Sequence, residues 1–259
     1  MVSHYKDIQF AVTDRVARIT LARPPLNVIT IAMAREMADA VNRVSVMPEV
    51  CAIVFATPPG GRTFSAGVSI EEHRPETVYQ MLEAFHDIFR ALNMAARPVV
   101  ALIGGAALGG GCELAAFADI VIATPAARFG QPEIKLGVFP PLAAVVLPHV
   151  VGDKKAREMM LTGELLTAEQ AQALGLVSYV VADNELEAKG EEILTALRQL
   201  SAPVLAMTRR AIMAGSWQGF EEALKRTEDI YLNQLMQLKD AVEGIEAFIA
   251  KRPPRWKQK

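Results

Sequence analysis

The sequence predicts an α/β protein, because apolar segments of strand length alternate with longer segments of helical periodicity. The runs VCAIVFAT, RPVVALIGG and DIVIATP are almost continuously apolar, which is typical of strands covered on both faces. Helical patterns lie between them at roughly 40-residue intervals, and this order indicates strand–helix–strand crossover units. In chain order we expect a strand pair, then a helix, a strand, a helix, a strand, a helix and a strand, at residues 8–24, 24–47, 50–57, 75–95, 97–105, 109–118 and 119–125.

The first strand pair should turn at Thr13–Asp14, and one face of the first helix should carry its apolar side chains. That face comprises Met33, Met37, Ala40, Val41 and Val44.

The chain becomes mainly helical after about Asp153. Thr167 is expected to cap the start of a short helix and Gly175 its end, before a short strand over 176–181. Residues 1–195 are therefore expected to form the core with the active site, and residues 196–259 a helical region. The apolar stripes of this region exceed what a small appendage can bury alone, so we expect it to pack on another subunit.

Composition excludes several classes of protein. The chain of 259 residues is 51% hydrophobic and 22% charged, which is typical of a globular protein. Its net charge of -2 argues against a nucleic-acid-coating surface, and no apolar run of about 18 residues predicts a membrane span. Cys51 and Cys112 lie in apolar segments, as buried thiols of a reducing cytoplasm would, and the N-terminus lacks a secretory signal. The four histidines show no metal-ligand spacing, so we expect a cytoplasmic protein without a metal.

Two acids occupy the most apolar part of the chain. Glu113 directly follows the glycines of "GGGCEL", and Glu133 lies in "GQPEI". A carboxyl group in an apolar pocket has a raised pKa, which suits acid–base catalysis near neutral pH. Each acid also has a structural interpretation: Glu113 as the buried partner of a distant basic residue, and Glu133 as an ordinary surface-loop acid.

The glycines Gly109, Gly110 and Gly111 allow the backbone to approach a ligand closely at the start of a helix. On its own this run could be a simple strand–helix turn. A second loop, "FSAGVSI" over residues 64–70, can present another free backbone N–H group. Two such groups could hold one thioester carbonyl oxygen while the two acids handle water and a carbon-bound proton, which is enolate chemistry.

The chain resembles the crotonase (enoyl-CoA hydratase/isomerase) superfamily over nearly its whole length. The matching pieces include "TFSAGVSI", "GGAALGGGCELAAFADIVIAT", "GQPEIKLG" and "LTGELLTAEQAQALGLVSYVV". The resemblance implies a spiral of ββα units with a C-terminal helical region, assembled as a trimer or a dimer of trimers. It places the two oxyanion-hole amides on Val68 and Gly110, and the two catalytic glutamates on Glu113 and Glu133. The implied partner is an acyl-CoA thioester, with no cofactor besides the coenzyme A of the substrate itself.

Two departures from the usual hydratase pattern narrow the resemblance. Val68–Ser69 replaces an alanine–aspartate pair, and "VFPPLAAVVLPHVVG" replaces a glycine-rich turn. In both loops the chain looks most like the hydratases of cyclohexa-1,5-diene-1-carbonyl-CoA, which belong to anaerobic degradation of benzoyl-CoA. The further residues expected to bind the substrate are Leu26, Ala66, Ser69, Ile70, Gly109, Phe139 and Pro140.

Other functions stay open on the sequence alone. One is a straight-chain enoyl-CoA hydratase or isomerase of fatty-acid β-oxidation. Another is a non-catalytic protein of the same scaffold that binds a CoA ester or RNA, although the acidic balance counts against RNA. The basic end "IAKRPPRWKQK" is either a solvated tail or a contact for CoA phosphates across a subunit boundary.

Overall fold

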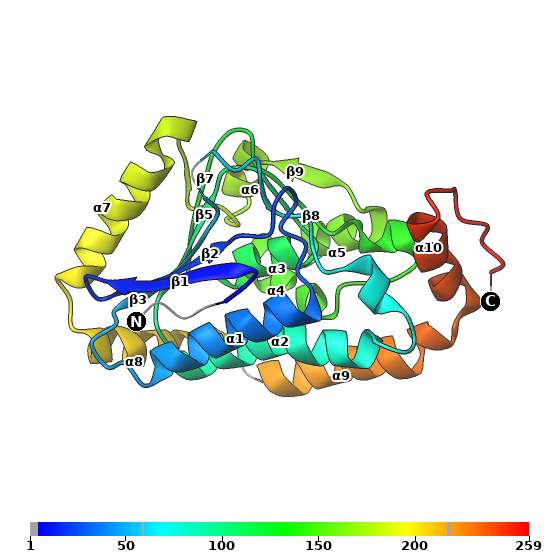
Figure 1. Cartoon of the computed structure of the whole chain (residues 1–259), viewed down its shortest axis with the longest axis horizontal. Helices are drawn as coiled ribbons and strands as arrows, with labels where there is room; N and C mark the ends of the chain where they lie inside the picture. Colours follow the sequence, from blue (N-terminus) through cyan, green and yellow to red (C-terminus); the bar gives the residue numbers. More distant parts are fainter. Residues whose placement is uncertain (1–4, 59, 217–218, 259) are drawn as a thin grey trace.

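The computed structural model of the chain describes residues 5–58, 60–216 and 219–258 and has two β-sheets surrounded by helices (Figure 1). The larger sheet is mostly parallel, with an antiparallel pair, β1 and β2, at one edge. In sheet order its strands are β1 (Ile8–Thr13), β2 (Val16–Leu21), β3 (Ala52–Ala56), β5 (Val99–Ile103), β7 (Ile120–Ala123) and β10 (Tyr179–Val180). The mixed α/β class predicted from the sequence is confirmed.

The second sheet is small, and the sequence did not predict it. Its strands, in sheet order, are β4 (Thr63–Ser65), β6 (Ala106–Leu108), β8 (Arg128–Gly130) and β9 (Leu165–Thr167). Each has three residues, which is too short to carry a recognisable alternation of apolar and polar positions. Each of β4, β6 and β8 follows a strand of the larger sheet, so the chain steps repeatedly from the large sheet to the small one.

Ten helices belong to the described part of the chain. They are α1 (Ile31–Ser45), α2 (Val78–Ala95), α3 (Gly110–Phe117), α4 (Pro141–Val151), α5 (Asp153–Thr162), α6 (Ala168–Ala173), α7 (Leu186–Arg198), α8 (Ala202–Ser216), α9 (Phe220–Asn233) and α10 (Lys239–Ile249). Short 3-10 helices cover Ile70–His73, Pro132–Leu136, Asp183–Glu185 and Leu235–Gln237. None of the helices in these described ranges is both long and apolar enough to cross a membrane.

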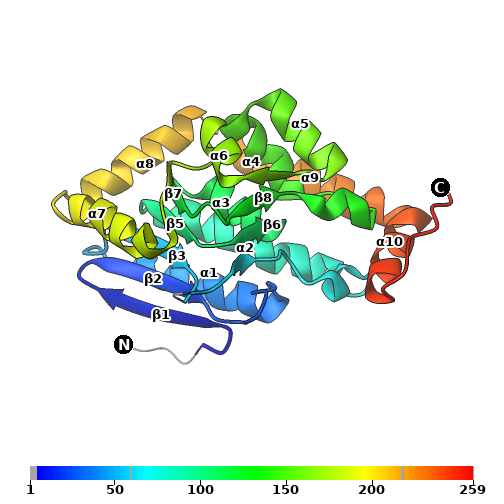
Figure 2. The same ribbon diagram turned by 90° about the horizontal axis from the view of Figure 1, so that it is seen from above.

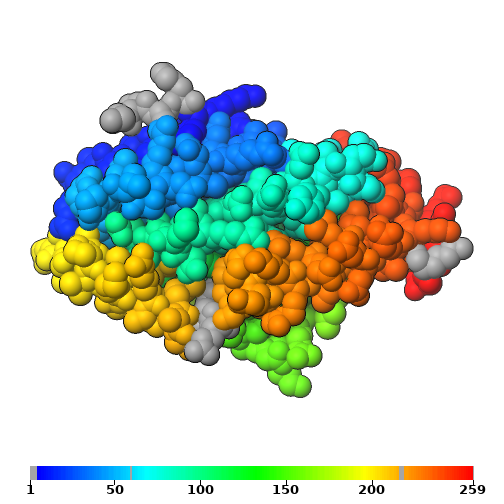
Figure 3. All heavy atoms as spheres, turned by 90° about the horizontal axis from the view of Figure 1, so that it is seen from below, coloured from blue at the N-terminus to red at the C-terminus, as the bar shows by residue number. Residues whose placement is uncertain are grey.

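The helix α1 begins where the side chain of Thr30 accepts a hydrogen bond from the Met33 N–H group. Its five predicted core residues are all buried, and the helix packs along α2. On the other side α2 meets α9, so that Figure 3 shows α2 between α1 and α9 on one face of the molecule. The helices α7 and α10 lie at opposite ends (Figure 2).

Local structure differs from the sequence-based expectations at several places, among them the short strand expected over 176–181, of which only Tyr179–Val180 is a strand. The first turn lies at Asp14–Arg15, one residue later than predicted, with φ angles of 46° and 66°. Thr167 caps α6 as predicted, but α6 ends at Ala173 and Gly175 stands beyond the capping residue Leu174. The segment that replaces the usual glycine-rich turn forms a helix, α4, because Pro141 suits the first helical position and aliphatic residues follow it.

Candidate active site

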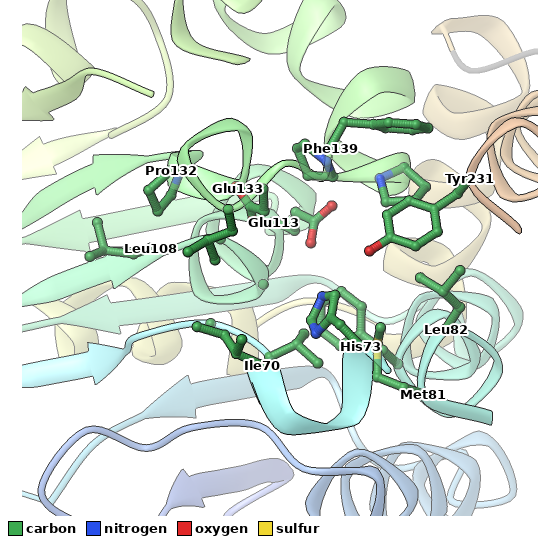
Figure 4. Close-up of a pocket in the computed structure, with 18 of the residues that line it drawn as sticks. Ile70, His73, Met81, Leu82, Leu108, Glu113, Pro132, Glu133, Phe139 and Tyr231 are labelled. Carbon is green, nitrogen blue, oxygen red and sulfur yellow. The ribbon is translucent and has the colours of Figure 1, made fainter. Parts of the chain in front are cut away.

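A cavity of about 440 Å³ lies where the small sheet meets α2, α3 and the C-terminal helices (Figure 4). Its wall is mainly apolar and is formed by Ala66, Gly67, Val68, Ile70, His73, Met81, Leu82, Phe85, His86, Leu108, Gly109, Gly110, Glu113, Pro132, Glu133, Lys135, Leu136, Phe139, Pro140, Pro141, Tyr231 and Phe248. The cavity therefore contains both acids that the sequence singled out. Tyr231 and Phe248 belong to residues 196–259, so the wall extends into the C-terminal region.

Glu113 lies in the first turn of α3 and is 3% exposed. Its Oε1 atom accepts a hydrogen bond of 2.7 Å from the Ala143 N–H group, in the first turn of α4. Burial raises the pKa of Glu113 to about 7, although the Ala143 bond acts in the opposite direction. No basic side chain pairs with Glu113 within the described residues, which removes the structural interpretation of a buried ion pair.

Glu133 lies in the 3-10 helix Pro132–Leu136 and faces the same cavity. Burial, and then repulsion by Glu113, raises the pKa of Glu133 to about 8. The buried amide of Gln131 lies 3.1 and 3.2 Å from the two Glu133 oxygens when its nitrogen faces them, and in that orientation it donates to both. Glu133 is thus part of the cavity wall rather than an ordinary surface acid.

The glycine run lets these groups approach one another. Gly109 has a φ of +50°, and a Cβ atom at this position would lie 2.5 Å from Glu133 Oε1. A Cβ atom on Gly110 would lie 2.9 Å from both Phe85 Cζ and Val68 Cγ2. Real Cβ atoms do not come so close to other atoms, so alanine at either position would displace the side chains that it meets.

Two backbone N–H groups of the cavity wall are without an acceptor in the chain as described. A parallel bridge joins Ile29 to the residues on either side of Val68, since Ile29 N–H donates to Gly67 and Ser69 N–H donates to Ile29, each at 2.9 Å. The Val68 N–H group has no acceptor among the described residues, and neither has the Gly110 N–H group at the start of α3. The loops are neighbours, because a Cβ atom on Gly67 would lie 3.6 Å from Gly110 N. Such a pair of donors can bind one oxygen atom.

Two of the predicted substrate-binding residues do not line the cavity. Leu26 is 49% exposed, and its carbonyl oxygen accepts a hydrogen bond from Ala66 N–H. Ser69 is buried, and its hydroxyl donates to Glu71. The other five, Ala66, Ile70, Gly109, Phe139 and Pro140, do line it.

Several cavity residues were not expected from the sequence. Met81, Leu82, Phe85 and His86 come from α2, for which the sequence predicted a helix but no part in a site. Tyr231 comes from α9, with no motif around it in the sequence. Its hydroxyl and the carboxyl of Glu113 point into the same space in Figure 4.

Comparisons with known proteins show the family of the chain. The profile of the enoyl-CoA hydratase/isomerase family matches residues 12–259. A cyclohexa-1,5-dienecarbonyl-CoA hydratase of Thauera aromatica is 35% identical over 245 residues, which is 93% of each chain. A short-chain-enoyl-CoA hydratase of Clostridium acetobutylicum is 31% identical over 243 residues, 92% of each chain.

Solved structures extend the agreement to the fold. The crystal structure of an enoyl-CoA hydratase from Mycobacterium avium subsp. paratuberculosis K-10 superimposes with a TM-score of 0.87 at 30% identity, covering 98% of this chain and 99% of that one. The resemblance to the crotonase superfamily seen in the sequence is confirmed. The chain belongs to the enoyl-CoA hydratase/isomerase family and is an enzyme of the hydratase type.

Proposed function

We propose that the protein adds water to a conjugated enoyl-CoA thioester, and that its substrate is cyclohexa-1,5-diene-1-carbonyl-CoA in anaerobic degradation of aromatic compounds. The observation that carries the hydratase proposal is the pair of acids, Glu113 and Glu133, in one apolar cavity with pKa values raised to about 7 and about 8. Two carboxyl groups that titrate near neutral pH can take one proton and give another in the same turnover.

In this proposal the thioester oxygen accepts hydrogen bonds from the Val68 and Gly110 N–H groups. These donors stabilise the negative charge that develops on the oxygen when a nucleophile adds to the conjugated system. Removing one such donor typically reduces the rate by a factor of about 10² to 10³. The free N–H groups beside the cavity support this role.

The two acids divide the proton transfers. Glu113, whose carboxylate is stabilised by the Ala143 N–H group, is the ionised member and takes a proton from water as the oxygen bonds to the β-carbon. Burial and the negative charge of Glu113 disfavour the anion of Glu133. Glu133 therefore carries the proton and gives it to carbon. For a dienoyl group the proton returns at the far end of the conjugated system. Water is added without net loss of a proton, and exchange between the acids and solvent restores the starting state.

The shape of the cavity supports a cyclic substrate. Phe139, Pro140 and Pro141 form a stiff part of the wall where the usual chain has glycines. The Thauera relative carries the name of a cyclic dienoyl-CoA hydratase. A straight-chain substrate is the second candidate, because the similarity to the short-chain hydratase of Clostridium is of comparable extent.

The test is turnover of matched thioesters by the purified protein. We expect hydration of cyclohexa-1,5-diene-1-carbonyl-CoA, with one ¹⁸O atom taken up from labelled water, to exceed that of crotonyl-CoA in kcat/KM. Faster hydration of crotonyl-CoA would establish the straight-chain alternative. Absence of water addition to every enoyl thioester in a panel of linear and cyclic acyl groups would refute the hydratase proposal.

A further inference from the structure

Two buried polar groups of the cavity have no role in the chemistry above. The Nε2 atom of His86 and the hydroxyl of Tyr231 have no hydrogen-bond partner among the residues that the structure describes, although both side chains are at most 1% exposed. Both line the cavity with the two glutamates. Buried polar atoms are nearly always paired in folded proteins, so two unpaired ones in one cavity point to a ligand group that pairs with them.

The hydrogen-bonding state of His86 follows from its other nitrogen. Nδ1 lies 2.6 Å from Glu228 Oε1, and the same oxygen accepts a bond of 2.8 Å from Arg90. Glu228 is therefore the acceptor and His86 Nδ1 the donor. Burial lowers the pKa of His86, which leaves a neutral ring with the lone pair on Nε2. His86 offers the cavity an acceptor.

Tyr231 offers the complementary group. Burial and the nearby glutamates raise the pKa of its hydroxyl, so the hydroxyl keeps its proton and can donate. Its ring packs edge-on against Phe139, with ring centroids 5.2 Å apart, which holds it in the wall. Tyr231 stands one helical turn after Glu228 on α9, so it lies on the same face of α9 as the residue that binds His86.

We propose that His86 and Tyr231 form a recognition site for a hydroxyl group on the acyl part of the substrate, on a carbon other than the reacting ones. A hydroxyl group is the simplest group that donates to His86 Nε2 and accepts from Tyr231 at once. Glu113 and Glu133 already carry out the proton transfers, which leaves this pair for a substituent of the acyl group. The inference rests on the proposed function and extends its substrate class from the unsubstituted cyclic dienoyl ester to acyl-CoA thioesters that also carry a hydroxyl group, among which ring-hydroxylated ones fit the wall best.

Binding of saturated thioesters tests the proposal without any turnover. The probes are cyclohexane-1-carbonyl-CoA and its 3-hydroxy, 4-hydroxy and 4-methyl derivatives, titrated calorimetrically into the whole protein. At least one hydroxy ester should bind roughly 10- to 100-fold more tightly than the unsubstituted ester, as two added hydrogen bonds allow. The methyl ester has nearly the same size and should gain no comparable advantage. A 4-oxo ester, which accepts from Tyr231 but cannot donate to His86, should show a smaller gain than the 4-hydroxy ester.

The variant Tyr231→Phe removes only the hydroxyl and should reduce the preference for the hydroxy esters by about tenfold or more. Tyr79→Phe is the matched control, because Tyr79 is 63% exposed on α2 and does not line the cavity. It should keep the full preference. Equal binding of hydroxy and unsubstituted esters, or a preference that survives Tyr231→Phe, would overturn the proposal and leave bound water as the partner of the pair. The binding test uses saturated thioesters and involves no chemical step, so its outcome does not depend on whether the protein hydrates simple enoyl thioesters.

Discussion

Glu113 and Glu133 have similar surroundings but different hydrogen-bond partners, and both are needed if water is added as proposed. Glu113→Gln or Glu133→Gln removes a proton-transfer group while keeping the size of the side chain. We expect kcat for hydration to fall by about 10²- to 10⁴-fold, with little change in KM, because the amide donors still bind the thioester. Steady-state hydration assays measure this. Glu158→Gln, on an exposed part of α5, is the control and should behave as the wild type. Normal turnover by either cavity variant would exclude the two-acid mechanism.

The pH dependence of kcat/KM should be bell-shaped, since the pair works with one proton between its two members. Activity should rise as pH increases through about 7, where Glu113 loses its proton, and fall above about 8, where Glu133 loses its own. A pH–rate profile for a slowly reacting thioester measures both limbs. A profile that is flat across this interval would contradict the shared proton.

Gly109 connects the backbone to the proposed acid. Gly109→Ala introduces a Cβ atom 2.5 Å from Glu133 Oε1 and places a side chain at a φ of +50°. We expect the free energy of unfolding to fall by about 1–3 kcal/mol and the rate of substrate hydration to fall markedly. Gly60→Ala separates the two effects, since Gly60 has a φ of +80° and nothing within 4 Å of its added Cβ. The control should lose stability alone; equal loss of hydration in both variants would show that the contact with Glu133 is unimportant.

Single residues also show the limit of sequence-based reasoning. Glu113 and Glu133 could be selected because an acid in an apolar segment is unusual wherever it occurs. His86 and Tyr231 could not, because each fits the pattern of an ordinary helix. Only the packing of α9 against α2 shows that their polar atoms share a cavity.

At the scale of elements, α4 forms part of the acyl wall and also holds Glu113. Replacing Pro140–Pro141 by Gly–Gly should loosen the wall and raise turnover of crotonyl-CoA relative to the cyclic dienoyl ester. Shape alone discriminates by about 1–3 kcal/mol, so a ratio of tenfold to a few hundredfold should shrink toward one. Both prolines restrict φ, so the variant should also be slightly less stable.

The ratio of the two kcat/KM values is the informative measurement for this variant. A displaced Ala143 N–H group would slow both substrates together and would not alter the ratio. An unchanged ratio would show that the α4 start only packs the core.

The elements that the sequence predicted well are those with enough length to repeat a pattern. The strands β3, β5 and β7 and the helices α1 and α2 are of this kind. The strands of the small sheet are held by pairing with segments far along the chain, such as β4 with β6 and β8 with β9, and this pairing leaves no periodic signal in three residues. The α4 start was interpreted as a stiff wall, and its helical form depends on the cavity and core that bury its aliphatic residues.

At the scale of the whole molecule, the C-terminal helices bury some of their apolar side chains within the chain and leave others exposed. Val204 and Met207 of α8 are 62% and 58% exposed, and Phe248 of α10 is 52% exposed. We expect the protein to sediment as a trimer or hexamer at micromolar concentration, because such side chains favour a partner surface. Val204→Asp with Met207→Asp should weaken this assembly. A wild-type chain that sediments as a monomer would contradict the expectation.

The raised pKa values of the two cavity acids also affect folding. An unfolded chain releases these protons near pH 4.5, whereas the folded protein retains them up to about pH 7 and about pH 8. Between these limits the folded state binds more protons than the unfolded state, so the free energy of unfolding decreases as pH rises. The contribution of the acids to stability is complete below about pH 4.5 and is lost as pH passes through the folded-state values. At neutral pH the molecule is therefore less stable than the same fold with uncharged side chains at positions 113 and 133. The burial that causes this loss of stability also leaves the cavity an exchangeable proton at neutral pH.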